Sequence, residues 1–85
     1  MSIKHFSYGR GREGNGIEIN GVMTVWFSYS TPIAFEHRGN LTIRKNTFSS
    51  TTGRHLNHVD DDKSKRIDGD EFEEKLERLL LLLQG

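Results

Sequence analysis

The chain has 85 residues, which is enough for one small domain. Its 12 Lys and Arg residues balance 12 Asp and Glu residues, and this zero net charge excludes the strongly basic domains that coat nucleic acid nonspecifically. Because the chain contains no cysteine, disulfides, thiolate metal sites and thiol nucleophiles are excluded as well.

Residues 1–16 are predicted to form a flexible N-terminal arm, because glycines crowd residues 7–16. Gly9, Gly11 and Gly14 spell the pattern G-x-G-x-x-G. The dinucleotide-binding motif needs a strand before this pattern and a helix after it. Since the following segment is predicted to be a strand, we do not interpret the glycines as a cofactor site, and we expect no cofactor.

Residues 17–47 alternate apolar and polar side chains in the manner of β-strands. Asn20-Gly21 predicts a type I′ hairpin turn, and residues 38–40 predict a second tight turn. Thr31-Pro32 predicts a bend between two strands. We therefore predict an antiparallel β-meander of about four strands. One face of its central strand would carry Met23, Val25, Phe27 and Tyr29, and the other Thr24, Trp26 and Ser28.

Two helices are predicted after the meander, which makes the fold class α+β. The first is short, spans residues 50–59 and is capped by Ser49 or Ser50. An acidic linker at residues 60–69 leads to a longer amphipathic helix at residues 70–84. Acidic residues crowd the first turn of this second helix, as the helix dipole prefers.

The second helix carries more apolar surface than one small sheet can cover. Five leucines follow each other at residues 79–83, and residues 72, 76, 79 and 83 have the spacing of a coiled-coil seam. We expect this excess to contact a second copy of the chain, in a homodimer or higher oligomer. The predicted interface residues are Phe72, Leu76, Leu79, Leu80 and Leu83. The alternative is a loosely ordered C-terminal end.

The charges are unevenly distributed along the chain. Residues 1–57 hold seven bases and three acids, whereas residues 58–85 hold five bases and nine acids. One interpretation is a basic surface for an anionic ligand, with the acidic part limiting nonspecific binding of nucleic acid. The other is that the two halves attract each other within one fold or across a dimer.

The densest group of functional side chains precedes and begins the first predicted helix. Four consecutive hydroxyl residues stand before an Arg-His pair, where the first N–H groups of the helix are unpaired. Such a helix start, with an arginine fork beside it, suits phosphate oxygens. The predicted phosphate-binding residues are Ser49, Ser50, Thr51, Thr52, Arg54, His55 and Asn57, with Tyr29 available to stack on a base. The alternative is structural, with Ser and Thr capping the helix and the Arg-His pair solvated or bound to backbone carbonyls.

Residues 28–34, with the sequence S-Y-S-T-P-I-A, together with Gly39, Asn46 and residues 49–57 carry a further signal. This string resembles a family of short proteins encoded by tailed phages and some archaeal elements, whose signature is S-Y-x-T-x-I-A followed by S-x-T-T-x-[KR]-H. The resemblance implies a viral origin and an α+β domain, and it implies no reaction.

By analogy with other small phage proteins, we expect a non-enzymatic protein that binds a nucleotide or nucleic acid in the host cytoplasm. Its role would be counter-defence against host immunity. One alternative is a protein–protein inhibitor of a host defence complex, similar to anti-CRISPR proteins. The other is a structural or assembly module without a small ligand.

Other sites receive less support. Asp60–Glu71 places oxygen ligands at several calcium-loop positions, but Lys65 stands where such a loop needs glycine, and we expect a solvated linker. No apolar run is long enough to span a membrane.

Two further patterns involve His55. His55 and His58 have helical spacing but no third metal ligand at a fixed distance. A hydrolase triad would need Ser49 or Ser50 with His55 and an acid such as Asp60, and residues so close on one short helix seldom reach that geometry. We therefore expect no metal site and no catalytic residue.

Overall fold

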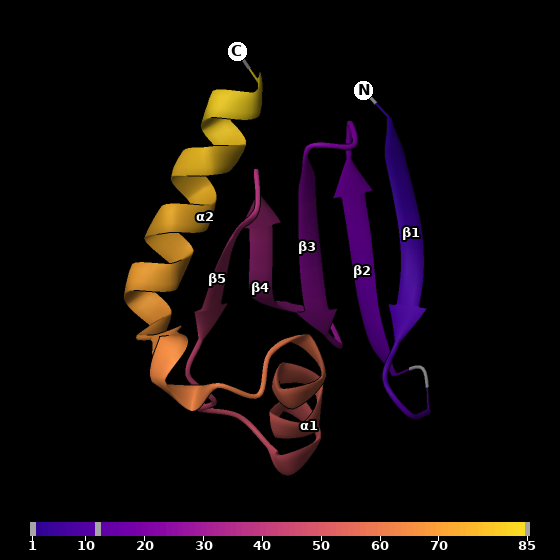
Figure 1. Cartoon of the computed structure of the whole chain (residues 1–85), viewed down its shortest axis with the longest axis vertical. Coiled ribbons are helices and arrows are strands. Elements are labelled where there is room, and N and C mark those ends of the chain that lie inside the picture. Colours follow the sequence, from indigo (N-terminus) through magenta and orange to yellow (C-terminus); the bar gives the residue numbers. More distant parts are fainter. Residues whose placement is uncertain (1, 12, 85) are drawn as a thin grey trace.

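The computed structural model describes residues 2–11 and 13–84, in which one sheet and two α-helices form an α+β fold (Figure 1). Five strands pair antiparallel in chain order, and a sixth short strand joins the last of them in parallel. The strands are β1 (Ile3–Tyr8), β2 (Gly14–Ile19), β3 (Met23–Ser28), β4 (Thr31–His37), β5 (Asn40–Arg44) and β6 (Arg66–Ile67). The helices are α1 (Ser50–Val59), the short 3-10 helix η1 (Lys63–Lys65) and α2 (Gly69–Gln84). The predicted order of meander, short helix and longer helix is confirmed.

The prediction of a flexible arm at residues 1–16 was wrong, although Met1 and Arg12 lie outside the described residues. β1 pairs with β2 along its whole length, with Phe6 opposite Gly16 and Tyr8 opposite Gly14. A Cβ atom on Gly16 would collide with the Phe6 ring, and one on Gly14 would collide with the Tyr8 ring. These two glycines therefore make room for aromatic rings in a regular sheet and do not loosen the chain.

Both predicted hairpin turns are present. Asn20 and Gly21 have φ angles of 54° and 70°, and the angles at Arg38 and Gly39 are 53° and 81°. Positive φ at both central residues is what a type I′ turn requires. The bend expected at Thr31-Pro32 is instead a turn at residues 29 and 30, and β4 begins at Thr31.

A β-bulge lies just after this turn. Phe27 pairs with Pro32, whereas Trp26 pairs with Ala34, so Ile33 is an extra residue in β4. The bulge places three consecutive residues, Ile33, Ala34 and Phe35, in buried positions. Pro32 is tolerated because β5 pairs with β4 only from Ala34 onwards.

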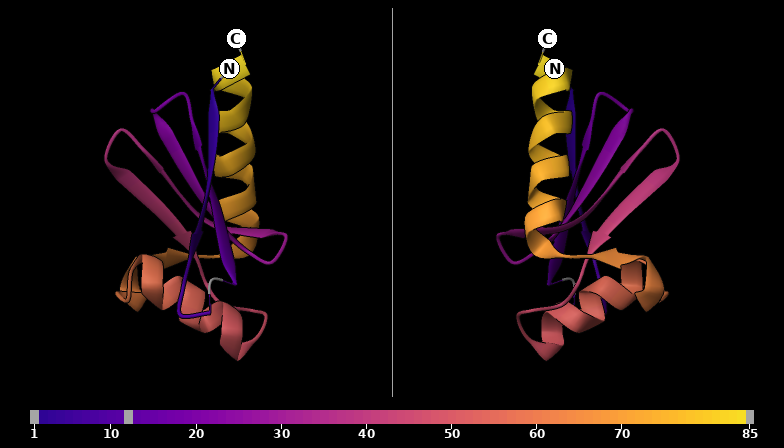
Figure 2. Two further views of the ribbon diagram at one scale, coloured as in Figure 1. Left: turned by 90° about the vertical axis from the view of Figure 1, so that its right-hand side faces the viewer. Right: turned by 90° about the vertical axis from the view of Figure 1, so that its left-hand side faces the viewer.

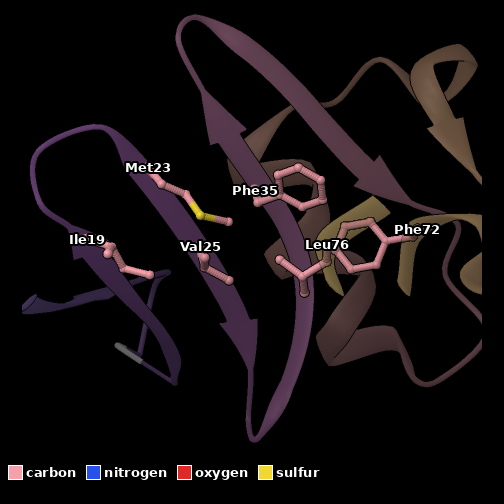
Figure 3. Close-up of a cluster of buried hydrophobic side chains, with 6 residues drawn as sticks. All are labelled: Ile19, Met23, Val25, Phe35, Phe72 and Leu76. Atoms are coloured by element: carbon pink, nitrogen blue, oxygen red, sulfur yellow. The ribbon is translucent and has the colours of Figure 1, made fainter. Parts of the chain in front are cut away.

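The two faces of the sheet bury separate apolar clusters. Figure 3 shows the first cluster, in which side chains from β2, β3 and β4 meet Phe72 and Leu76 of α2. Its sheet residues are Ile19, Met23, Val25 and Phe35. The second cluster joins Leu56 of α1 to Ile33, Ala34 and Ile43. The side views in Figure 2 show α2 running along the sheet while α1 lies across one end of it.

The packing of α2 corrects the predicted oligomer interface. Phe72 is fully buried in the chain's own core and is not available to a second copy, whereas Leu76 is buried there at 8% exposure and also lines an apolar groove. Leu79, Leu80 and Leu83 pack partly against the same cluster. The most exposed apolar side chains of the helix are those of Leu81 and Leu82, at 62% and 72%.

The predicted acidic linker at residues 60–69 is ordered by its own side chains. Asp60 accepts a hydrogen bond from the Asp62 amide, and Asp62 accepts two from Ser64. These bonds lower the pKa values of the two carboxyls, helped at Asp60 by a bond from Lys65. Residues 66 and 67 then pair with β5 as β6.

Candidate functional site

The centre of the site is His55, which α1 holds against the end of β3. His55 and Ser28 are each only 2% exposed, and the His55 Nδ1 atom lies 2.7 Å from the Ser28 Oγ atom. The same Oγ atom lies 2.9 Å from Oγ1 of Thr52, one turn earlier on α1. Because the Nδ1 atom and the two hydroxyls are bonded to one another, these bonds fix the orientation of the imidazole ring.

The other ring nitrogen of His55 faces the loop between β1 and β2. Its Nε2 atom is buried without a hydrogen-bond partner among the described residues. The nearest carboxylate oxygen is Oε2 of Glu13, at 3.7 Å. Gly9 approaches the same ring so closely that a Cβ atom there would lie 3.5 Å from the His55 Cδ2 atom. The loop therefore covers this side of His55 and buries Nε2 beside Glu13, at the edge of a space between the loop and α1.

That space is a cleft of about 510 Å³ between the β1–β2 loop and α1, here called the loop cleft. Two arginines contribute to it, Arg10 from the loop and Arg54 from the helix. Its remaining lining residues are Gly9, Gly11, Glu13, His55, Asn57 and His58. The cleft thus combines glycine-rich backbone, two guanidinium groups and two imidazoles with one carboxylate.

Tyr8 packs against the two histidines. Its ring centroid lies 5.5 Å from that of His55 and 5.2 Å from that of His58. The Tyr8 hydroxyl donates a hydrogen bond to the Phe27 carbonyl at 2.8 Å. Burial of this phenol raises its pKa to about 12, so it stays a neutral donor across the physiological range.

Two of the predicted phosphate-binding residues are used within the fold, and three others, Arg54, His55 and Asn57, line the loop cleft. Ser49 caps α1 by accepting from the Thr52 amide at 3.2 Å, and Thr52 itself is buried. Ser49 is thus a helix cap, as the structural alternative expects, whereas the Thr52 hydroxyl bonds to Ser28 inside the fold. Ser50 is exposed and Thr51 is half-buried. Both lie outside the lining of the loop cleft.

Arg54, His55 and Asn57 reach the loop cleft from the side of α1 and not from the N-terminus of the helix. Arg54 and Asn57 are exposed there, and His55 lies beneath them. The Arg54 guanidinium donates to Thr51 Oγ1 at 3.3 Å. Tyr29 is 61% exposed, and its ring centroid lies 6.2 Å from that of His55.

Sequence reasoning missed Ser28 and the loop residues Arg10 and Glu13. The strand alternation placed Ser28 on the same face as Trp26, but nothing local indicates that this face meets His55, 27 residues later. The loop residues were missed because their glycines suggested a flexible arm. The available signal was the presence of two aromatic residues, Phe6 and Tyr8, and two glycines, Gly14 and Gly16, at matching positions of a possible hairpin.

Ser28, His55 and Glu13 lie in the order of a nucleophile, a base and an acid, a different set from the one considered in the sequence. The Ser28 Oγ atom is buried and shared between two hydrogen bonds, so it cannot contact a substrate. The arrangement can hold a ligand through the exposed arginines, and the His55 Nε2 atom becomes available only when Glu13 moves aside, whereas the serine positions the ring.

Within residues 2–11 and 13–84, no group of three or more His, Asp or Glu side chains is placed to hold a metal ion. In the same part of the chain, no helix is both long and apolar enough to cross a membrane.

No curated protein and no solved structure matches the chain. A family of unknown function, DUF8033, matches residues 3–74, which contain every strand, α1 and the first turn of α2, and the chain belongs to this family.

Proposed function

We propose that the protein binds a phosphate-bearing ligand, a nucleotide or a nucleic acid strand, in the loop cleft. The observation that carries this proposal is the convergence of Arg10, Arg54 and the unpartnered His55 Nε2 atom on one cleft under a glycine-rich loop. Guanidinium forks and loop amides are the groups that proteins use most often to hold phosphate oxygens. The loop cleft supplies both.

The guanidinium groups of Arg10 and Arg54 are available to a ligand. Among the described residues, no carboxylate forms an ion pair with Arg10 or Arg54. The hydrogen bond of Arg54 to a threonine hydroxyl leaves the rest of its fork free. A ligand phosphate would therefore gain charge-assisted hydrogen bonds without first breaking an ion pair.

His55 adds a directed polar atom to the same cleft. When Ser28 donates to Nδ1, the proton of the neutral imidazole lies on Nε2, which then acts as a donor toward the cleft. Glu13 now provides the negative oxygen nearest to this atom. Because its side chain is half-exposed on the loop, it can move aside when a phosphate oxygen takes that position.

The biological setting of the proposal follows from the resemblance of residues 28–57 to short phage-encoded proteins. It supports a role in counter-defence against host immunity, in the host cytoplasm and without an enzymatic step. A second candidate is a protein inhibitor of a host defence complex. The observation that favours it is the exposed Tyr29 ring, since exposed tyrosines are common anchors at protein interfaces.

The test is a thermal-shift panel of mono-, di- and cyclic nucleotides beside short single-stranded DNA and RNA. A ligand at a hundred times its Kd stabilises the folded state by about 2.7 kcal/mol, which a melting curve detects easily. Arg54→Ala and Arg10→Ala should each weaken the response, by roughly 1.5–3 kcal/mol of binding free energy. Arg78→Ala is the matched control, since Arg78 is an exposed arginine on α2 that pairs with Glu74. If no compound in the panel shifts the melting temperature, the proposal is wrong.

A further inference from the structure

A second cleft opens on the other flank of α1, and its chemistry is simpler than that of the loop cleft. Its volume is about 300 Å³, and we call it the lysine cleft. The lining residues are Lys45, Asn46, Gly53, Asn57, Lys63 and Arg66. Three cations and two amides thus face one hollow, and no carboxylate lines it. Such a set of donors suits an oxyanion.

The cations of the lysine cleft are only partly neutralised. No carboxylate forms an ion pair with Lys63 among the described residues, whereas Lys45 pairs with Asp68 at 3.1 Å. Arg66 donates to the Asn57 side chain at 2.8 Å and to the Asp60 carbonyl at 3.3 Å. Its Nε atom is buried without a partner. The cleft therefore holds two cations without a carboxylate partner, one of which is fixed in place by bonds to neutral groups.

The two clefts share one residue of α1. Gly53 and Asn57 line the lysine cleft, whereas Arg54, Asn57 and His58 line the loop cleft. At about 100° per residue, Asn57 projects between the direction of Gly53 and that of Arg54. Ser50, Arg54 and Asn57 are all exposed. The outward face of α1 is therefore a polar ridge with a cationic cleft on each side.

We infer that the lysine cleft is a second phosphate site, and that the ligand is a single-stranded oligonucleotide that crosses the α1 ridge from one cleft to the other. The inference rests on the function proposed for the loop cleft. Because Asn57 lines both clefts, the two hollows adjoin on the exposed face of α1. Successive phosphates of a stacked single strand follow each other at about 3.4 Å per nucleotide, so a short strand can place one phosphate in each cleft.

The binding of single strands to such a surface also fits the position of the aromatic side chains. Tyr29 is exposed beside His55, and Phe48 is exposed just before the helix, with the Arg44 guanidinium over its ring at 4.9 Å. Neither ring lines a cleft, so a strand would reach them from its ends. Exposed rings next to cationic grooves are the platforms on which unpaired bases stack. Phosphate contacts from the clefts and stacking on these rings would together hold a strand without reading its sequence.

The experiment compares a labelled mononucleotide with labelled single strands of increasing length by fluorescence polarisation. Affinity should rise with length until a strand spans both clefts. Lys63→Ala should weaken binding of the spanning strand by about tenfold or more, which is the effect of losing one charge-assisted contact. It should also reduce the salt dependence by about one phosphate contact. Mononucleotide affinity should stay unchanged in this variant.

Two variants make the result specific. Lys75→Ala removes an exposed lysine of α2 that pairs with Glu71, and since neither residue lines a cleft, it should leave all affinities unchanged. Lys63→Arg keeps the cation and should restore strand binding. The melting temperature of each free variant should match that of the wild type, because Lys63 is exposed and unpaired in the described structure.

The outcomes separate the two proposals. If a mononucleotide binds as tightly as any strand and Lys63→Ala has no effect, the strand inference is overturned and the loop-cleft function stands. If Lys63→Ala weakens strand binding but Arg54→Ala does not, the loop-cleft function and the crossing path both fall. If neither strands nor mononucleotides bind, both proposals are overturned.

Discussion

The Nδ1 atom of His55 and the Oγ atom of Ser28 lie 2.7 Å apart and join α1 to the end of β3. Because both side chains are buried, water cannot take over either role when one of them is lost. The same bond orients the imidazole ring so that its second nitrogen lies 3.7 Å from Glu13, which lines the loop cleft. One buried contact therefore links the packing of α1 to the polar lining of the candidate site.

Ser28→Ala should destabilise the protein. The substitution leaves the Nδ1 atom of His55 without a partner and also breaks the bond to Thr52 Oγ1. Leaving buried polar atoms unsatisfied costs about 1–3 kcal/mol of unfolding free energy. Urea denaturation measures the change. Ser30→Ala, in the exposed turn two residues later, is the matched control and should change stability by less than about 0.5 kcal/mol. Equal stability of the two variants would show that the buried bond contributes nothing.

Gly16→Ala should destabilise the β1–β2 pair, because the Phe6 ring occupies the space that a methyl group would need. Overpacking of this kind costs about 1–3 kcal/mol, and the ring must leave its position over the strand. Asn15→Ala provides the comparison, since Asn15 is exposed in the same strand. Urea denaturation of both variants decides the point, and a Gly16→Ala protein as stable as the control would contradict the close contact.

Local patterns were sufficient to predict most of the fold. The Asn20-Gly21 and Arg38-Gly39 turns and the Ser49 cap act within a few residues, and the sequence shows them directly. β1 was missed because its partner β2 begins with glycines that were interpreted as flexible. The loop cleft was missed for a related reason. It forms only when residues 9–13 meet residues 54–58, and no pattern within either segment indicates the other.

A phosphate site at the helix start stays a prediction, but two of the residues assigned to it are used within the fold. The capping role of Ser49 and the inward position of Thr52 use the hydroxyls that the sequence seemed to offer to a ligand. Propensity alone could not show which side of α1 faces the core. The side is set by Leu56, which packs against Ile33 and Ile43 in the second apolar cluster.

Tyr8 should titrate well above a free tyrosine. In a Tyr29→Phe background Tyr8 is the single tyrosine of the chain, so its ionisation is read directly from ultraviolet absorbance. Burial raises the pKa of Tyr8 from 10.0 to about 12 in the folded protein. The contribution of the neutral phenol to stability is complete below pH 10, the unfolded value, and is lost as the pH rises through about 12.

Two measurements check this prediction. The absorbance of the folded protein should change with a midpoint near 12, and that of the urea-unfolded protein near 10. The urea midpoint should fall between those pH values and less so in a Tyr8→Phe variant, which has no phenol to ionise. A folded protein whose Tyr8 ionises at the same pH as the unfolded chain would place the ring in solvent.

Self-association through α2 stays a prediction, and the structure moves it to a different set of leucines. An apolar groove of about 420 Å³ lies beside Pro32, Leu80 and Leu81, and Leu82 is exposed on another side of α2. The Leu81→Asp, Leu82→Asp double variant should sediment as a monomer if the wild type is a dimer or larger. Its stability per chain should change little, because neither side chain is in the core. A wild type that sediments as a monomer would contradict the prediction.

Tyr29 occupies a backbone conformation that is unfavourable for a large side chain. Its φ angle is 56°, in the left-handed region that asparagine and glycine tolerate best. Tyr29→Asn should therefore raise the unfolding free energy by up to about 1 kcal/mol, since the exposed ring loses little packing. If the ring stacks on a base, the same change should weaken oligonucleotide binding by about 1–3 kcal/mol. Tyr29→Phe keeps the ring and should preserve both properties. Urea denaturation and fluorescence polarisation on the three proteins test the two effects separately, and an asparagine variant that is less stable would show that ring contacts with His55 outweigh the backbone strain.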